Sequence, residues 1–214
     1  KNSSSDKKEY YLFNKIPFIL KDPLPIYVEI ENVISNINRS IPEHLFYEID
    51  SIFIGQFPEL EQRDVKAAYL DGAIYTTNVQ KSDVDLFDDI VHEVAHSLEK
   101  PKYLEIYGDD LIELEYLGKK RRLLDILKAR GYNIDSSAYT TVKYDKQFDE
   151  FLYFDLGFKK LENFTNGLFV TPYSVTSISE YFSEGFENFF LKDKKYLSKI
   201  SPELFKKVKF LSEP

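Results

Sequence analysis

The segment 88–99 constrains the fold of this chain more than any other part of the sequence. It reads DDIVHEVAHSLE, and its apolar side chains recur three and four residues apart, as on the buried face of an α-helix. On such a helix His92 and His96 lie one turn apart on the same side, so both imidazoles can reach one Zn²⁺. Glu93 lies between them and can reach a water that zinc activates. The segment therefore predicts a buried helix with a His-Glu-x-x-His zinc motif.

Chance and a purely structural helix are the alternatives to a zinc site. The chain has only three histidines in 214 residues, so an accidental match at this spacing is rare. The third histidine, His44, has no partner at metal-ligand spacing, and we expect it to be a structural or surface residue. Zinc is the interpretation that best fits the pattern.

The composition limits the ligands and partners that are available. The chain contains no cysteine, which excludes disulfides and leaves any zinc to histidine and carboxylate ligands. Its formal net charge of −8 argues against a nucleic-acid partner, because phosphates would be repelled. No apolar run approaches the roughly 18 residues of a membrane span. The chain begins at Lys1 and contains no methionine, so we expect a mature product or a piece of a larger polypeptide or assembly.

The first half of the chain predicts a small sheet around the motif helix. Ser82 or Asp83 can cap that helix, and Pro101 follows its expected end. The other expected elements are a polar tail over 1–8, an extended segment over 10–25, a helix over 27–37, a strand over 46–54 and a hairpin over 65–76 with an Asp-Gly turn.

The second half predicts mainly helices. We expect helices over 104–129, 176–191 and 202–211, with Gly131 stopping the first, and a helical or mixed segment over 146–165. A basic cluster at 119–122 is either a substrate or partner patch or, more simply, a solvated helix face. A chain of 214 residues can bury one substantial core, so we expect a single domain over 9–214.

The motif lacks a third zinc ligand, which a catalytic site needs beside its water. The third histidine of the longer H-E-x-x-H-x-x-G-x-x-H motif is absent, so a carboxylate must serve. Glu180, Glu184 and Glu187 share one face of the 176–191 helix. A cation facing Glu180 or Glu184 would offset their repulsion, and the other could orient a ligating histidine. A capping box from Ser177 to Glu180 and a solvated acidic stripe are the alternatives.

This combination resembles the catalytic domain of anthrax toxin lethal factor and its relatives, a family that includes the Pro-Pro endopeptidases. In that family a tyrosine lies seven residues before the zinc-ligating glutamate, and a second acidic residue lies four after it. Tyr173, Glu180 and Glu184 match these positions. The resemblance implies that Glu180 is the third zinc ligand, that Glu184 supports the site, and that Tyr173 donates to the oxyanion. We expect Tyr181 to be the substitute donor if Tyr173 points away.

The resemblance spans roughly residues 46–99 and 165–212, and it implies an α+β zincin-like fold. In such a fold the motif helix packs beneath a small twisted sheet, a mainly helical second half supplies Glu180, and a cleft runs between them. The segment 64–75 resembles the family's edge strand, so Ala73, Ile74 and Tyr75 are expected to bind substrate by main-chain pairing. Residues 102–165 exceed the family's compact spacing and are expected to be a helical insertion.

The expected function is that of a zinc-dependent endopeptidase that cleaves a peptide or protein substrate. One Zn²⁺ per chain would activate water, and Glu93 would be the general base. The alternative is a non-catalytic protease-like module of a larger toxin or virion protein, in which zinc only holds helices together. A zinc hydrolase that acts on another substrate is a third reading. Relatives include secreted toxins and enzymes, so an extracellular location is expected by analogy alone.

Overall fold

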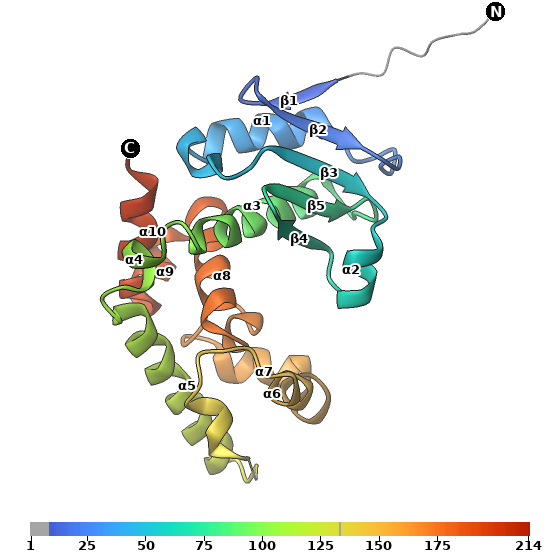
Figure 1. Ribbon diagram of the computed structural model, residues 1–214. Helices are drawn as coiled ribbons and strands as arrows, with labels where there is room; N and C mark the ends of the chain where they lie inside the picture. Colours follow the sequence, from blue (N-terminus) through green and yellow to red (C-terminus); the bar gives the residue numbers. More distant parts are fainter. Residues whose placement is uncertain (1–8, 133) are drawn as a thin grey trace, which may run out of the picture. The chain divides into compact units, whose positions relative to one another are not determined.

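The computed structural model describes residues 9–132 and 134–214 (Figure 1). The chain divides into two compact units, the first ending at Ser97 and the second spanning Leu98–Pro214. The fold class is α+β, as predicted, with a five-stranded sheet in the first unit and helices in the second. The predicted tail at 1–8 lies outside the described residues. The single domain and the insertion over 102–165 stay predictions.

The sheet of the first unit is mixed, with the order β1-β2-β3-β5-β4. Parallel pairing aligns Phe18, Ile52 and Ile74 in one buried row across its middle strands. Helices α1 and α3 cover this face of the sheet (Figure 1). The bounds are β1 Tyr10–Leu12, β2 Ile16–Leu20, α1 Ile30–Ser40, β3 Ser51–Gly55, β4 Ala67–Leu70, β5 Ala73–Thr77 and α3 Asp83–Glu99.

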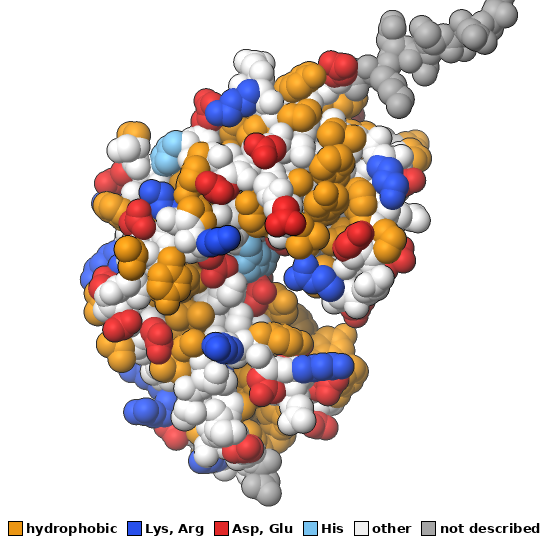
Figure 2. Space-filling model, in the orientation of Figure 1, with side chains coloured by type: hydrophobic (Ala, Val, Ile, Leu, Met, Phe, Trp, Pro, Cys, Tyr) orange, Lys and Arg blue, Asp and Glu red, His pale blue; other side chains and the backbone are white. Residues whose placement is uncertain are grey.

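The opposite face of the sheet carries a smaller aromatic cluster. Phe53 and Tyr75 stack with ring centroids 5.0 Å apart, and Phe57 meets Tyr75 edge-on. Leu60, on the short helix α2 (Pro58–Arg63), is buried in the same cluster. Figure 2 shows hydrophobic side chains gathered over this sheet. The sheet is therefore packed on one face and partly covered on the other, as in many α+β folds.

Local signals predicted most elements of the first unit. The hairpin is confirmed, with Asp71 and Gly72 both in the left-handed region (φ 47° and 85°) that a tight β-turn needs. The strand predicted over 46–54 is wrong in its first part, because the chain turns there: Ile49 N–H donates to Phe46 C=O, and β3 begins only at Ser51. His44 is an exposed residue of the 3₁₀ helix Glu43–Phe46, as predicted.

The second unit is built around α8 (Ile178–Leu191), whose Tyr181, Phe182 and Phe186 are fully buried. The helix predicted over 104–129 is broken in two, because Asp110 adopts a left-handed conformation (φ 61°) between them. The other bounds are α4 Tyr103–Tyr107, α5 Leu111–Ala129, α6 Lys146–Glu150, the π-helix η3 Phe151–Gly157, α7 Phe158–Thr165, η4 Tyr173–Val175, α9 Lys194–Ile200 and α10 Pro202–Ser212.

The basic cluster at 119–122 is neither a solvated face nor a partner patch at its first two positions. Lys119 is only 6% exposed and Lys120 is fully buried. The Lys119 ammonium donates to the carbonyls of Leu168 and Ile200 and to Ser201 Oγ, so a buried charge is met by fixed acceptors. Burial lowers the pKa of both lysines to about 8. The helical pattern could not reveal this, since the acceptors come from distant parts of the chain.

Two glycines in this unit give a matched test of its packing. A Cβ at Gly185 would lie 2.2 Å from Leu204 Cδ2, whereas nothing lies within 4 Å of one at Gly118. We expect Gly185→Ala to lower the free energy of unfolding by about 1–3 kcal/mol, because Leu204 is buried and must shift. Gly118→Ala, in an exposed helix interior, should raise it by about 0.5–1 kcal/mol. Urea unfolding measures both, and equal stabilities would contradict this packing.

Candidate functional site

The two motif histidines lie on α3, in the first unit, as predicted. Ser82 Oγ accepts from the Asp85 N–H at 3.1 Å and caps the helix. The Asp83 carboxylate instead accepts from the Glu29 N–H at 2.7 Å, at the start of α1. Leu86, Ile90, Val91, Val94 and Ala95 are fully buried along α3. This packing fixes the rotation of the helix and leaves both histidines partly exposed.

The two imidazoles converge. Their Nε2 atoms are 3.1 Å apart, and the rings meet edge-on with centroids 4.9 Å apart. Two nitrogens about 2.0–2.1 Å from a tetrahedral zinc would be separated by about 3.3–3.4 Å, so His92 and His96 fit as a zinc-binding pair. The same separation suits an N–H···N hydrogen bond between the rings. Zinc would replace that proton and needs both rings neutral.

Glu93 points to the sheet rather than to bulk solvent. Its side chain is 7% exposed, and its Oε2 accepts from the Tyr69 backbone N–H at 2.7 Å. Tyr69 belongs to β4, so the strand and the motif helix are joined through the carboxylate of the predicted general base. The sequence motif alone gave no sign of this contact, because it depends on how the strands are ordered.

The predicted substrate-binding residues are not on the edge of the sheet. Ala73, Ile74 and Tyr75 belong to β5, which lies between β3 and β4 and is paired with both. Their backbone groups already pair with β3 and β4, so the predicted edge position, on which substrate pairing depended, is wrong. The hairpin turn at Asp71–Gly72 folds β4 to the outside, so β4 (Ala67–Leu70) is the edge strand at this side.

The predicted third ligand lies in the second unit, in the first turn of α8. The Glu180 N–H donates to Ser177 Oγ at 3.1 Å, so Ser177 caps the helix. Glu180 and Glu184 are partly exposed, whereas Glu187 is buried and pairs with Lys192. The three glutamates therefore do not form a solvated acidic stripe, because Glu187 is buried. The cap and a ligand role are compatible, since the cap uses the backbone of Glu180.

The Tyr173 phenol is partly exposed and stays protonated. It lies on η4, is 44% exposed and borders a cavity of about 610 Å³ that Phe158, Pro172 and Tyr196 also line. Partial burial raises the pKa of Tyr173, and the nearby Glu180 carboxylate raises it further. The phenol therefore keeps its proton at neutral pH and can donate it in a hydrogen bond.

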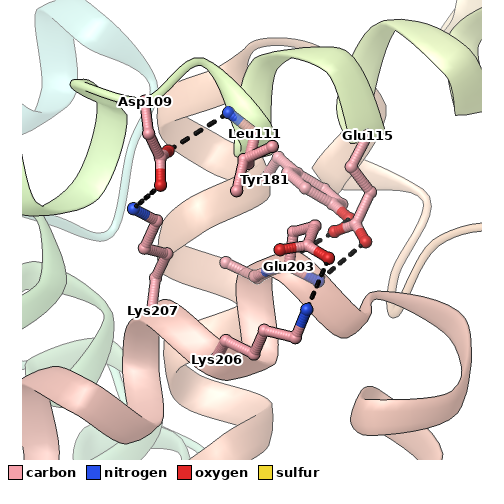
Figure 3. A network of polar contacts seen from close by, with 8 residues as sticks. Asp109, Leu111, Glu115, Tyr181, Glu203, Lys206 and Lys207 are labelled. Carbon is pink, nitrogen blue, oxygen red and sulfur yellow. Dashed lines mark hydrogen bonds and ion pairs between the residues drawn. The ribbon is translucent and has the colours of Figure 1, made fainter.

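Tyr181 cannot stand in for Tyr173. It is fully buried, and its hydroxyl donates to Glu115 Oε1 at 2.8 Å (Figure 3). The prediction that it could serve as a substitute donor is wrong. Successive residues of a helix point about 100° apart, so Tyr181 faces the core although the preceding Glu180 is partly exposed.

Sequence reasoning missed a contact network at the C-terminal end of α3. The Glu99 carboxylate accepts from Ser179 Oγ at 2.6 Å and from the Tyr107 hydroxyl at 2.7 Å. Burial raises the pKa of Tyr107, and the charge of Glu99 raises it further, so this hydroxyl stays protonated. The motif ends before Glu99, and nothing in the spacing of Tyr107 or Ser179 marks them as its partners.

A second missed carboxylate lies on α3, one turn before the motif. Asp89 accepts from the Gln80 amide at 2.9 Å. Burial raises the pKa of Asp89, and the amide and the Lys66 charge act in the opposite direction. Asp89 is one of four aspartates in the segment 83–89, and nothing in the sequence separates a buried acid from its more exposed neighbours.

Comparisons of the chain with protein-family models, with curated proteins and with solved structures each found no match. Among residues 9–132 and 134–214, none of the helices has the length and apolar character needed to cross a membrane.

Proposed function

We propose that this protein is a zinc-dependent endopeptidase in which His92, His96 and Glu180 hold one Zn²⁺. The convergence of the two histidine Nε2 atoms, 3.1 Å apart beside the buried Glu93, carries the proposal. When bound, zinc supplies the acidity that lowers the pKa of water toward about 7 and polarises a carbonyl. The donor set is chemically suitable, because neutral imidazoles and a carboxylate are common ligands of catalytic zinc.

The choice of Glu180 rests on its neighbours. Ser179, the preceding residue, donates to Glu99, the last residue of the helix that carries both histidines. That hydrogen bond fastens the first turn of α8, where Glu180 lies, to the end of α3. Glu187 is paired with Lys192, which leaves Glu184 for a supporting role. In many zinc sites a second carboxylate orients a ligating histidine through a hydrogen bond, and Glu184 is proposed for that role.

Two side chains would carry the proton chemistry. Glu93 would accept a proton from the attacking water and return it to the leaving amine. Tyr173 would donate from its phenol to the oxygen that gains charge as the peptide carbonyl becomes tetrahedral. A substrate strand would pair with the edge strand β4, in place of the β5 residues that the sequence indicated.

A structural zinc site in a non-catalytic module is the competing proposal. Structural sites are closed by four protein ligands and need no base beside them. The buried carboxylate of Glu93, next in sequence to His92, favours the enzyme. Cleavage of peptides by the zinc-loaded protein separates the two proposals, because a structural module would bind zinc without turnover.

Zinc affinity provides a matched test of the ligand set. We expect the wild-type protein to bind one Zn²⁺ per chain, and Glu180→Gln to weaken binding by more than about 100-fold because a direct ligand is lost. Glu184→Gln removes the same charge one turn away and should cost only about 10–100-fold. Chelator competition measures both variants. A larger loss from Glu184→Gln would make Glu184 the zinc ligand and Glu180 the supporting residue. Absence of zinc binding by the wild type would overturn the proposal.

A further inference from the structure

We propose that the edge strand β4 positions the general base: the Tyr69 backbone N–H holds the Glu93 carboxylate, and this contact sets the register in which a substrate peptide pairs with β4. The substrate part of this inference rests on the proposed function, whereas the positioning contact can be tested without it. Both residues lie in the first unit.

The hydrogen-bond pattern of the hairpin shows which backbone groups face outward. The Thr77 N–H donates to the Lys66 C=O at 2.8 Å, so this opposed pair is a hydrogen-bonded one. Pairs alternate along an antiparallel ladder, which makes Ala67↔Thr76 and Tyr69↔Ile74 non-hydrogen-bonded pairs. The N–H and C=O groups of Ala67 and Tyr69 therefore point away from β5, toward the open side of β4.

The contact to Glu93 is strong for its kind. A backbone N–H donating to a carboxylate at 2.7 Å is a charge-assisted hydrogen bond, about twice as strong as a neutral one. The Glu93 side chain is also withdrawn from water, at 7% exposed, so the bond acts in a weakly screening environment. Together these features fix the direction in which the carboxylate points.

This contact removes one group from the set that a substrate strand can use. An antiparallel peptide on β4 would find the N–H and C=O of Ala67 and the C=O of Tyr69, while the Tyr69 N–H belongs to Glu93. The substrate carbonyl at that position receives no hydrogen bond from Tyr69 and lies next to the Glu93 carboxylate, so a water molecule is needed between the two acceptor oxygens. The cleaved bond is therefore selected by main-chain register at β4, next to the base.

Proline at position 69 tests the positioning contact. Tyr69→Pro removes the outward N–H without breaking a ladder bond to β5, as edge strands allow. Tyr69→Ala removes the same side chain but keeps the N–H, and Ala67→Pro reports the cost of proline at the neighbouring outward position. In the metal-free full chain, we expect Tyr69→Pro to unfold about 4–8 °C below Tyr69→Ala. In a Glu93→Ala background this difference should shrink to that between Ala67→Pro and wild type.

If the unfolding temperatures of Tyr69→Pro and Tyr69→Ala differ as much in the Glu93→Ala background as without it, the inference is wrong. If Tyr69→Pro does not fold, amide hydrogen exchange decides: the Tyr69 N–H should exchange at least about tenfold faster in Glu93→Ala than in wild type, with Ala67 unchanged. Equal exchange would also overturn it. In the zinc-loaded enzyme, Tyr69→Pro should retain zinc and lose at least about tenfold in kcat. Absence of cleavage by the wild type would instead contradict the proposed function and leave the thermal and exchange results standing.

Discussion

Replacement of Glu93 by glutamine is expected to lower kcat by about 10²–10⁴-fold while zinc remains bound. Glutamine has nearly the same shape, and its amide oxygen can still accept the Tyr69 N–H that holds Glu93 at 2.7 Å. It cannot take a proton from water at neutral pH. The loss therefore isolates proton transfer from packing and from metal binding, and steady-state kinetics with zinc measured in the same sample checks it.

The matched control for this variant is Asp85→Asn, which removes one negative charge from the same helix two turns away. We expect it to leave kcat within about twofold, because long-range charge effects are screened in buffer. Near wild-type turnover in Glu93→Gln would show that another group is the base. A comparable loss in Asp85→Asn would show that the effect is a general one of charge.

The largest expected loss of stability comes from Glu115→Ala. The Glu115 carboxylate accepts from the Tyr181 hydroxyl at 2.8 Å and from the backbone N–H groups of Glu203 and Leu204, at the start of α10 (Figure 3). It thus satisfies a fully buried tyrosine and two helix-terminal donors that have no intrahelical partner. Its removal leaves these groups without their acceptor and should cost about 3–5 kcal/mol.

Glu113→Ala is the control for this variant, since it removes a partly exposed glutamate two residues earlier on the same helix. We expect a change within about 0.5 kcal/mol, as for most surface substitutions. Urea denaturation of both variants measures the difference. The neighbouring pairs Lys206–Glu203 and Lys207–Asp109 reach solvent and should contribute little by comparison. Equal stabilities of the two glutamate variants would contradict the role of Glu115.

The parts of the molecule that follow from the sequence are those determined locally. The apolar period of α3 predicted its buried face, Ser82 its start, and Asp71-Gly72 the hairpin that β4 and β5 form. The capping box that the sequence offered at Ser177 is present at the start of α8, although the helix was expected to begin at Thr176. In each case residues a few positions apart contain the whole signal, because helix faces, caps and tight turns depend on short-range geometry.

The parts that escaped prediction depend on contacts between distant residues. The order of strands places β4 outside β5, so the expected substrate edge at Ala73–Tyr75 was assigned to the wrong strand of a correctly predicted hairpin. Lys119 is buried because carbonyls at 168 and 200 come to meet it. Glu99 gains its role from Ser179, 80 residues away. Spacing along the chain carries no information about such pairs.

Peptide-library cleavage shows whether the protein is a zinc-dependent endopeptidase. The protein loaded with one equivalent of Zn²⁺ would be compared with the chelator-treated protein and with zinc-loaded Glu93→Gln on the same library. We expect discrete cuts by the zinc-loaded wild type and none by the other two samples. Cuts that persist without zinc, or a wild type that binds zinc at His92 and His96 and cuts nothing, would contradict the proposed function.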